Sequence, residues 1–393
     1  IRDRKKMSFN KNIGVLGAGS WGTALVKMLS ENCDKIFWYS RNDIQIEEII
    51  KTKKNPKYLK DLEIDTDKIS ISSDLNFIID NSDILIIAIP SPYIEKSLNE
   101  HKTALANKII FSGSKGVIPE SHLVITEHLH KEYNIPYKNL GILSGPTHAE
   151  EIAKGKLSYL TVGSSNDEIS KYLSKKLFSP YVHTSISNDV IGIEYAATLK
   201  NIYSILVGIS FGLGYGDNFI SVLISHCTKE MINFIKSIDN VKREFSHSAY
   251  IGDLLVTTYS KHSRNRTFGE MIGKGLPVKK AISKMSMIVE GYYATKNAYE
   301  ISKSKNMNLV IKVSFNNYDE WRASFDNHAE RASVCDESRT TVGKIDDQNC
   351  IVMLYNVDMA GMQNLMTSDF LVELSKKMNI KNDEMHSFEP LQN

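Results

Sequence analysis

The stretch that decides the fold is Gly17-Ala18-Gly19-Ser20-Trp21-Gly22, a G-x-G-x-x-G sequence near the N-terminus. It follows a short apolar run, Asn12–Leu16, that predicts a buried strand, and it opens a helical pattern, Trp21–Ser30. In this context the first glycine permits a tight turn, the second lets the backbone approach a pyrophosphate, and the third lets helix pack on strand. Amides at the helix N-terminus then face the phosphates, so a dinucleotide-binding loop is favoured over a structural turn.

Short apolar runs alternate with longer amphipathic ones over the first half of the chain. The most apolar, Ile84–Ile89, is stopped by Pro90 and Pro92. Further expected strands are Lys35–Tyr39, Lys108–Ser112, Leu140–Leu143 and Tyr159–Val162. Because such runs between helical stretches are typical of a parallel sheet covered on both faces, we expect a doubly wound α/β domain of the Rossmann type over residues 11–190.

From Ile191 to about Ser304 the periodicity is helical. Between Tyr195 and Thr228 only Lys200 and Asp217 carry a formal charge. A helix that is apolar on nearly all sides is buried in a domain core or an interface. We therefore expect an all-helical second domain over residues 191–309.

A third pattern follows Leu309. Strands and helices are expected in the order βαββαβ, at Val310–Phe315, Asp319–Ala332, Thr341–Ile345, Cys350–Val357, Met362–Met378 and Met385–Phe388. This order predicts a small ferredoxin-like α+β module over residues 310–393. Residues 1–10 are basic without an apolar stretch, so we expect a disordered extension, with Met7 as the natural start, rather than a secretory signal.

Composition excludes several classes of protein. The 393 residues include 48 Lys+Arg, 46 Asp+Glu and 42% apolar residues, for a net charge of +2. These values favour a packed, soluble, multidomain protein and give no basic face for a nucleic acid. The apolar runs are far shorter than the roughly 20 residues of a membrane helix. Four scattered cysteines without a C-x-x-C pair indicate a reduced cytoplasmic protein without a metal site.

The end of the second expected strand bears on the choice of nicotinamide cofactor. An acidic residue there binds the ribose hydroxyls of NAD, whereas an arginine accommodates the 2′-phosphate of NADP. The sequence Tyr39-Ser40-Arg41-Asn42-Asp43 places the arginine first. Arg41 favours NADP unless it is a solvated loop residue, and Asp43 keeps NAD open.

Lys200 is the lone cation of its apolar helical stretch. A lysine amid so much apolar surface needs a partner or a lowered pKa, and a lowered pKa suits a general acid or base near neutral pH. The alternative is a lysine that snorkels at a helix end. Asp253 is expected either to orient Lys200 or to cap a helix.

Other turns offer hydrogen-bond donors to an anion. Ser263-Arg264-Asn265-Arg266 combines guanidinium and amide donors that suit a phosphate dianion. Lys115 and the turn Ser144–Ala149 each follow an expected strand, and ligands of α/β sheets gather at the carboxyl ends of strands. We expect these turns to converge on one site, with His148 structural and Tyr58 either a cofactor contact or a surface residue.

Seven ordered motifs resemble a known family. They are Gly17-Ala-Gly-Ser-Trp-Gly-Thr-Ala24, Ser114-Lys-Gly116, Ser144-Gly-Pro146, Glu194-Tyr-Ala-Ala-Thr-Leu-Lys-Asn201, Gly252-Asp-Leu254, Ser263-Arg-Asn-Arg-Thr-Phe-Gly269 and Val289-Glu-Gly291. Together they resemble the bacterial-type NAD(P)-dependent glycerol-3-phosphate dehydrogenases, over about residues 11–309. The resemblance implies reversible reduction of dihydroxyacetone phosphate to sn-glycerol 3-phosphate with NADPH or NADH, feeding phospholipid synthesis, in a homodimer.

The same resemblance implies roles for single residues. Lys200 resembles the proton donor and acceptor of the family. The implied substrate contacts are Lys115, Gly145, Thr147, Lys200, Asp253, Ser263, Arg264 and Asn265. The expected cofactor contacts are Gly17, Gly19, Ser20, Trp21, Gly22, Arg41, Tyr58, Lys115, Ala149, Arg264, Ile288 and Glu290.

The C-terminus departs from this pattern. Family members continue with further helices after the region of Asn308, whereas this chain enters a segment that resembles ferredoxin-like modules pairing into dimeric α/β barrels. The module is either a true fusion or a junction of two reading frames. Its Trp321, Phe325, His328 and Arg331 line a pocket or, as the favoured interpretation, pack on a helix face.

Two other functions stay open at this point. One is a different dehydrogenase with Rossmann and helical domains, acting on β-hydroxyacids or ketopantoate. The other is a nucleotide-sensing protein without turnover, with the C-terminal module as its output.

Overall fold

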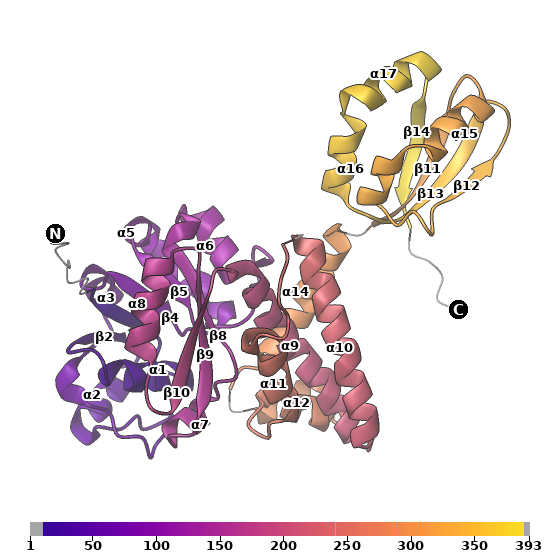
Figure 1. Cartoon of the computed structure of the whole chain (residues 1–393). Coiled ribbons are helices and arrows are strands. Elements are labelled where there is room, and N and C mark those ends of the chain that lie inside the picture. Colours follow the sequence, from indigo (N-terminus) through magenta and orange to yellow (C-terminus); the bar gives the residue numbers. More distant parts are fainter. Residues whose placement is uncertain (1–10, 240, 286, 306, 389–393) are drawn as a thin grey trace, which may run out of the picture. The chain divides into compact units, whose positions relative to one another are not determined.

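A computed structural model describes residues 11–239, 241–285, 287–305 and 307–388 (Figure 1). The chain divides between Asn297 and Ala298 into two compact units.

The first unit contains an eight-stranded sheet in the order β10-β9-β8-β5-β4-β1-β2-β3. The strands are β1 (Ile13–Leu16), β2 (Ile36–Tyr39), β3 (Ile69–Ser72), β4 (Ile84–Ile87), β5 (Ile109–Ser112), β8 (Leu140–Ser144), β9 (Ser158–Ser164) and β10 (Val182–Ser187). Neighbours run parallel except β8 and β9, which are antiparallel, so the expectation of a parallel sheet is corrected there. The sequence did not predict β3 and β10, because serines and other polar residues interrupt these two edge strands.

Helices cover both faces of this sheet. Along β4, Ile84 and Ile86 belong to one apolar cluster with residues of α1 and α8, whereas Leu85 and Ile87 belong to a second with residues of α3 and α6. The helices of this part are α1 (Ser20–Ser30), α2 (Asp43–Thr52), α3 (Leu75–Asp80), α4 (Ile94–Leu98), α5 (Lys102–Leu105), α6 (Ile125–Tyr133), α7 (Ala149–Ala153) and α8 (Asp167–Leu177). A small antiparallel pair, β6 (Val117–Ile118) and β7 (Leu123–Val124), lies between β5 and α6 along the chain.

The carboxyl ends of the central strands are level. Leu16, the last residue of β1, pairs with Tyr39 of β2 and Ile87 of β4, and Ile87 pairs with Ser112 of β5. The turns that follow these strands therefore begin at one edge of the sheet, which is where open α/β sheets bind ligands.

A helical region completes the first unit. Its helices are α9 (Val190–Gly212), α10 (Asp217–Ile238), α11 (Asp253–Tyr259), α12 (Arg264–Gly273) and α13 (Val278–Lys284), and α14 (Glu290–Lys305) runs past the boundary between the units. Glycines let α9 and α12 approach closely: a Cβ on Gly208 would lie 2.1 Å from the carbonyl of Arg266, and one on Gly269 would lie 2.1 Å from that of Ile205. A mixed α/β protein with a parallel Rossmann-like sheet and a helical domain is thereby confirmed.

Helix α9 is long and apolar enough to cross a membrane, the single described helix for which this holds. However, 78% of its most apolar stretch is buried inside the protein. That burial is the property of a core helix.

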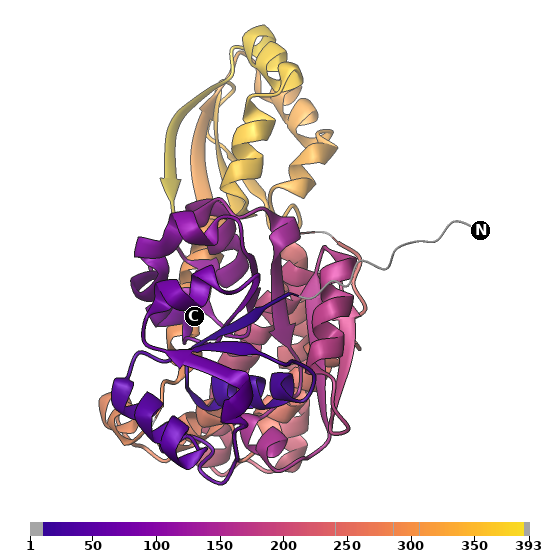
Figure 2. The ribbon, with the colours of Figure 1, turned by 90° about the vertical axis from the view of Figure 1, so that its left-hand side faces the viewer.

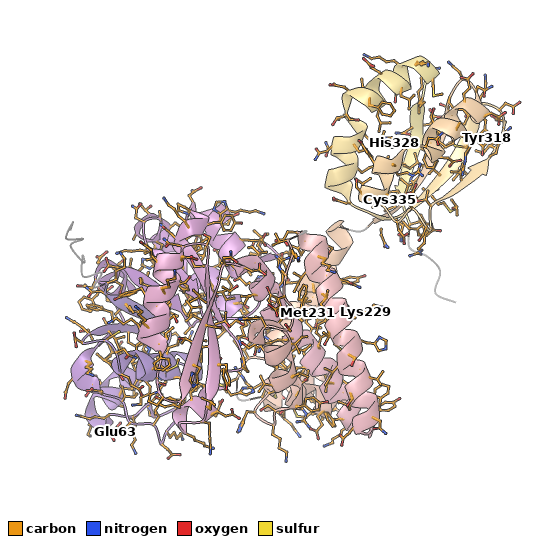
Figure 3. All side chains as sticks on the ribbon, in the orientation of Figure 1. Glu63, Lys229, Met231, Tyr318, His328 and Cys335 are labelled. Atoms are coloured by element: carbon orange, nitrogen blue, oxygen red, sulfur yellow. The ribbon has the colours of Figure 1, made fainter. Side chains whose placement is uncertain are left out.

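Helix α10 shows the usual division between a core face and an outer face. Its buried residues are Ile220, Ile224, Cys227, Met231 and Ile235, spaced three to four positions apart. Lys229, two positions before Met231, is exposed (Figure 3).

The second unit is a four-stranded antiparallel sheet with helices on one side, as Figure 2 shows. Its elements are β11 (Met307–Ser314), α15 (Tyr318–Asp326), β12 (Thr341–Lys344), β13 (Asn349–Val357), α16 (Met359–Met366), α17 (Asp369–Met378) and β14 (Lys381–Ser387). The sheet order is β12-β13-β11-β14. Leu309, Ile311 and Val313 of β11 face a core that includes Trp321.

Several expected boundaries in this unit are corrected, among them the start of β11, which is Met307 rather than Val310. The helix expected over Met362–Met378 is two helices, because the Ser368 side chain caps a new N-terminus by accepting from the Leu371 amide at 3.4 Å. Helix α15 ends at Asp326, followed by a 3₁₀ segment, Ala329–Ser333. The last strand begins at Lys381 rather than Met385, since an edge strand exposed along its whole length carries no apolar pattern.

The aromatic side chains of the second unit pack on one another. Trp321 stacks between Phe315 and Phe325, with ring centroids 4.8 and 5.0 Å apart, and the Arg331 guanidinium lies 3.7 Å from the Phe325 centroid. His328, which is labelled in Figure 3, stacks on Phe370 with ring centroids 5.7 Å apart. These contacts agree with the helix-face interpretation of the four residues singled out in the sequence.

Candidate active site

A cavity of about 830 Å³ opens between the carboxyl edge of the sheet and the helical region of the first unit. Of the residues predicted for the site, those that line it are Gly17, Gly19, Ser20, Trp21, Arg41, Tyr58, Lys115, Thr147, Ala149, Lys200, Ser263, Arg264, Asn265, Ile288 and Glu290. Gly22, Gly145 and Asp253 stand behind this lining. The structure therefore brings together turns that are separated by as many as 273 residues in the sequence, from Gly17 to Glu290.

The three glycines of the N-terminal loop have three different surroundings. Gly17 has φ +122°, and a Cβ there would lie 2.8 Å from the carbonyl oxygen of Ala88. A Cβ on Gly19 would meet nothing within 4 Å, whereas one on Gly22 would lie 2.0 Å from the carbonyl oxygen of Gly17. Gly17 thus makes the turn, Gly22 packs helix on strand, and Gly19 leaves bare backbone beside open space, as a pyrophosphate requires.

Helix α1 begins at this loop, and no side chain caps its N-terminus. Its first backbone amides therefore donate no capping hydrogen bond to a protein side chain, and the positive end of the helix dipole faces the cavity. The loop fits the pyrophosphate of a dinucleotide in backbone conformation, space and electrostatics.

Arg41 and Tyr58 form the far wall of this end of the cavity. Arg41 is exposed in the turn after β2, and Tyr58 is half-buried in the segment after α2. Between them lies Asn55, which the sequence did not single out; its side chain is fully buried. A single asparagine in the polar run Lys53–Lys57 carries no signal that separates it from a surface turn residue.

Lys200 lies at the opposite end of the cavity and is 5% exposed. Its Nζ donates to Asp253 Oδ1 at 2.7 Å and to Thr257 Oγ1 at 2.8 Å. Asp253 Oδ2 accepts from Lys115 Nζ at 3.0 Å and from Ser144 Oγ at 3.3 Å. One buried carboxylate is therefore shared by two ammonium groups, which leaves net positive charge at this end of the cavity.

Burial lowers the pKa of Lys200 to about 7; Asp253 opposes this shift and Lys115 adds to it. Burial by itself would raise the pKa of Asp253, but the two lysines hold it below its ordinary value. A lysine in this state exists in both protonation forms near neutral pH, which is what a reversible proton donor and acceptor needs.

The geometry of this group decides between the alternatives left open for Lys200 and Asp253. Lys200 does not snorkel toward solvent, because its amine is held at both a carboxylate and a hydroxyl inside the protein. Asp253 is not the N-cap of α11; Gly252 is, and Asp253 is the first residue of the helix. A π-helical turn over Ser248–Gly252 leads into α11 immediately before the aspartate.

Two contacts of this group were not assigned to it from the sequence, although the turn that begins at Ser144 was expected at the site. Thr257 lies one turn after Asp253 on α11, so the i, i+4 spacing was a usable signal. Ser144, the last residue of β8, approaches Asp253 through the tertiary fold alone.

The basic cluster at the start of α12 divides into inward and outward members. Ser263 caps the helix by accepting from the Arg266 amide at 3.3 Å, and Asn265 Oδ1 accepts from the Gly291 amide at 3.0 Å. Arg264 lines the cavity. Arg266 turns away, donating to the Tyr259 carbonyl at 2.7 Å with its guanidinium 4.3 Å from the Phe211 centroid.

The turn after β8 supplies a further wall. Gly145 has φ +126°, and a Cβ there would lie 2.4 Å from the carbonyl oxygen of Tyr159, so this turn requires glycine. Thr147, His148 and Ala149 line the cavity. Burial lowers the pKa of His148, and Lys200 and Lys115 lower it further.

Ile288 and Glu290 close the cavity near Arg264. Arg264 Nη1 donates to the Ile288 carbonyl at 3.4 Å, and Asn201 Nδ2 donates to Glu290 Oε2 at 3.4 Å. Burial raises the pKa of Glu290, although Arg264, Lys115 and Lys200 oppose the shift. Asn201 directly follows Lys200 on α9, so one turn of this helix contacts both Asp253 and Glu290.

Two family models match the chain. The N-terminal model of the NAD-dependent glycerol-3-phosphate dehydrogenases matches residues 12–170, and their C-terminal model matches residues 189–318. Both matched stretches contain site residues, Gly17 to Ala149 in the first and Lys200 to Glu290 in the second.

Individual proteins agree with the family models. Glycerol-3-phosphate dehydrogenase (NAD(P)+) of Oceanobacillus iheyensis is 34% identical over 302 residues, which cover 77% of this chain and 87% of that protein. The Fusobacterium nucleatum enzyme of the same name is 33% identical over 76% of this chain and 89% of its own length. The crystal structure of glycerol-3-phosphate dehydrogenase from Coxiella burnetii superposes with a TM-score of 0.70 at 29% identity, covering 75% of this chain and 90% of that chain.

Sequence, fold and the arrangement of the cavity lead to one assignment: the chain belongs to the NAD-dependent glycerol-3-phosphate dehydrogenase family of nicotinamide-dependent oxidoreductases.

Proposed function

We propose that this chain reduces dihydroxyacetone phosphate reversibly to sn-glycerol 3-phosphate with NADPH or NADH, supplying the glycerol phosphate of phospholipids. The observation that carries the proposal is Lys200, buried and bonded to Asp253 at one end of a cavity whose other end is the glycine loop. The cavity thus joins a proton donor to a dinucleotide loop.

The cofactor half of the site is assigned to the sheet edge. Gly17, Gly19 and Gly22 shape the backbone that would hold the pyrophosphate, with Ser20 and Trp21 at the start of α1. Arg41 and Tyr58 would hold the adenosine half, and Lys115, Ala149, Arg264, Ile288 and Glu290 the nicotinamide half. When bound, the cofactor supplies the hydride.

The substrate half is assigned to the charged end of the cavity. Arg264 and Asn265, at the N-terminus of α12, provide a guanidinium and an amide for a phosphate dianion, and Ser263 fixes the start of that helix. Thr147 would contact the substrate from the turn after β8, and Gly145, which is not part of the cavity lining, would act by shaping that turn. Holding the phosphate in this way orients the carbonyl, which is the entropic part of catalysis.

Lys200 is assigned as the catalytic residue. In the reducing direction its ammonium donates a hydrogen bond to the ketone oxygen and then transfers its proton there; in the reverse direction the neutral amine accepts the hydroxyl proton. Asp253 and Thr257 fix the amine, and the shared carboxylate keeps Lys115 beside it. A pKa of about 7 makes both directions accessible at neutral pH.

We propose the following organisation of the chain: a Rossmann domain over residues 11–190, a helical substrate and dimerisation domain over 191–309, and a ferredoxin-like module over 310–393. The strand order β12-β13-β11-β14 supports the ferredoxin-like assignment, as does the element order, which is βαββαβ when α16 and α17 are counted as one broken helix. The resemblance of both parts to proteins that form dimers supports a homodimer, and the burial of α9 supports a protein without membrane insertion. The scattered cysteines support a cytoplasmic location. The expected disordered extension, residues 1–10, lies outside the described residues.

The test is nicotinamide absorbance with purified protein, dihydroxyacetone phosphate, and NADPH or NADH in parallel. We expect oxidation of at least one cofactor, and the ratio of the two rates ranks them. Oxidation with β-hydroxyacid or ketopantoate-type substrates but not with dihydroxyacetone phosphate would overturn the substrate assignment. Binding of cofactor without any turnover would instead indicate a nucleotide sensor.

A further inference from the structure

We propose that Asn55 is a positioning residue that holds the Tyr58 turn against the glycine loop and so preforms the adenosine half of the cofactor site. The proposal rests on the proposed function for the identity of the cofactor. Asn55 does not line the cavity, so it would act on the cofactor only through other residues.

The amide nitrogen of Asn55 reaches the glycine loop. Its Nδ2 donates to the carbonyl oxygen of Ala18 at 3.1 Å and to Thr23 Oγ1 at 2.8 Å. Ala18 lies between the first two glycines of the loop, and Thr23 in turn donates from Oγ1 to the carbonyl of Gly19 at 2.8 Å. One side chain therefore contacts both the loop and the first turn of α1.

The amide oxygen of Asn55 holds the next segment of the cavity wall. Its Oδ1 accepts from the backbone amides of Lys57 and Tyr58, both at 3.1 Å, and from Gln45 Nε2 at 3.0 Å. The two backbone bonds fix the turn that carries the Tyr58 side chain to the cavity. Oxygen and nitrogen of one amide thus connect two chain segments about 35 residues apart.

Gln45 connects a third segment to this pair. Its Nε2 also donates to the Ala18 carbonyl at 3.0 Å, and its Oε1 accepts from Ser40 Oγ at 3.0 Å. Ser40 directly precedes Arg41 at the end of β2. The side chains of Asn55 and Gln45 therefore join the glycine loop, the Arg41 turn and the Tyr58 turn, which are the three walls assigned to the pyrophosphate and adenosine.

Burial explains why such a link is sensitive. Asn55, Thr23 and Ser40 are buried, and an amide with both groups fully bonded has one allowed orientation. Removing it leaves the Lys57 and Tyr58 amides without their acceptor, so the turn is free to adopt other conformations before the cofactor arrives. The cofactor must then order the turn at the expense of its own affinity.

The experiment compares Asn55→Ala with wild type in cofactor binding without substrate, by nicotinamide fluorescence. We expect the Kd for NADPH or NADH to rise about tenfold. At saturating cofactor, kcat and the KM for dihydroxyacetone phosphate should each stay within about twofold, since the Lys200 end is untouched. A matched control is Asn166→Ala, which removes the N-cap of α8 and its bonds to Glu168 and Ile169 amides, away from the cavity.

A double-mutant cycle with Tyr58→Ala tests the route of the effect. If Asn55 acts through the turn, Asn55→Ala should weaken binding less in the Tyr58→Ala protein than in wild type. An unchanged Kd in Asn55→Ala, the same rise in Asn166→Ala, or effects that simply multiply would overturn the proposal. If wild type binds cofactor but does not reduce dihydroxyacetone phosphate, the proposed function fails while the Kd comparison still decides the role of Asn55.

Discussion

The two ends of the cavity are built by different means. At the cofactor end the pyrophosphate loop is made of backbone: Gly17, Gly19 and Gly22 shape it, and the positive charge at the loop comes from the start of α1. The other end is made of buried side chains, Lys200, Asp253 and Lys115, whose charges alter one another. Cofactor binding at the first end depends on free space beside the backbone, whereas the protonation of Lys200 at the second end depends on burial. The two ends should therefore respond to substitution in different ways.

The largest expected effect is at the charged end. Lys200→Ala should lower kcat by about 10³-fold, because the proton donor to the substrate oxygen is removed, while the cofactor Kd changes less than about twofold. Steady-state rates and a fluorescence titration measure the two quantities. Lys229→Ala, an exposed lysine on α10 (Figure 3), is the control and should match wild type. Retained turnover in Lys200→Ala would remove Lys200 from the catalytic role.

Asp253→Asn should have the next largest effect. Asp253 opposes the lowering of the Lys200 pKa, so its loss should take that pKa further below about 7. The ammonium form then becomes scarcer at neutral pH, and reduction at pH 7–8 should fall by about 10²-fold. In wild type the rate of reduction should decline as pH rises through about 7, and in the variant this decline should begin at lower pH. Identical pH profiles of kcat/KM would contradict the coupling.

The glycine loop offers a smaller effect that separates binding from folding. Gly19→Ala places a Cβ in open space, so the Tm should be unchanged while the cofactor Kd rises about tenfold. Gly22→Ala places a Cβ 2.0 Å from a backbone oxygen and should cost about 1–3 kcal/mol of stability. Thermal melts and cofactor titrations of both variants would show the contrast. A destabilised Gly19→Ala protein would mean that this space is not reserved for a ligand.

The smallest effect concerns the helix that carries Lys200. Glu194 on α9 is fully buried and accepts from the Thr126 amide and hydroxyl of α6; burial raises its pKa to about 8. The folded state therefore retains a proton that the unfolded chain releases above about pH 4.5, so this contribution to stability is lost as pH rises from about 4.5 to 8. The slope is at most about 1.4 kcal/mol per pH unit.

Glu194→Gln should remove that slope. Free energies of unfolding measured by denaturant at pH 5.5, 6.5 and 7.5 would show it, with the exposed Glu63→Gln (Figure 3) as control. A slope that persists in Glu194→Gln would assign the pH dependence to another group.

The difference between the two ends also explains which parts of the site could be predicted from the sequence. The glycine loop and strands such as β4 are local patterns, and both were predicted. Lys200 was predicted because its apolar neighbours along α9 are visible in the sequence. Its partner Asp253 lies 53 residues away along the chain, and Lys115, which shares that carboxylate, lies 138 residues from Asp253. Spacing alone does not assign such pairs.

Other features of the fold and the site could not be recognised from the residues around them in the sequence. The antiparallel direction of β9 depends on how the chain returns to the sheet and leaves no pattern in the sequence. Strand β3 does alternate isoleucine with serine, which is typical of an edge strand, but the alternation is only four residues long and was missed by a prediction that relied on continuous apolar runs. Asn55 sits among lysines and a proline in the sequence, and only its contacts in three dimensions distinguish it from a turn residue. Side chains that act on other protein groups are the hardest to predict from sequence.

The π-helical turn over Ser248–Gly252 has a consequence for how this segment tolerates changes of length. A π turn contains one residue more than an α turn, and each residue of an α-helix rotates the next by about 100°. Deleting one residue there would let an ordinary α turn form but would swing the Asp253 carboxylate away from both lysines. The number of residues in this segment is therefore fixed by the pairing of Asp253 with Lys200 and Lys115. In-frame deletions of one residue here should abolish activity, while helices α9 and α12 still pack on each other.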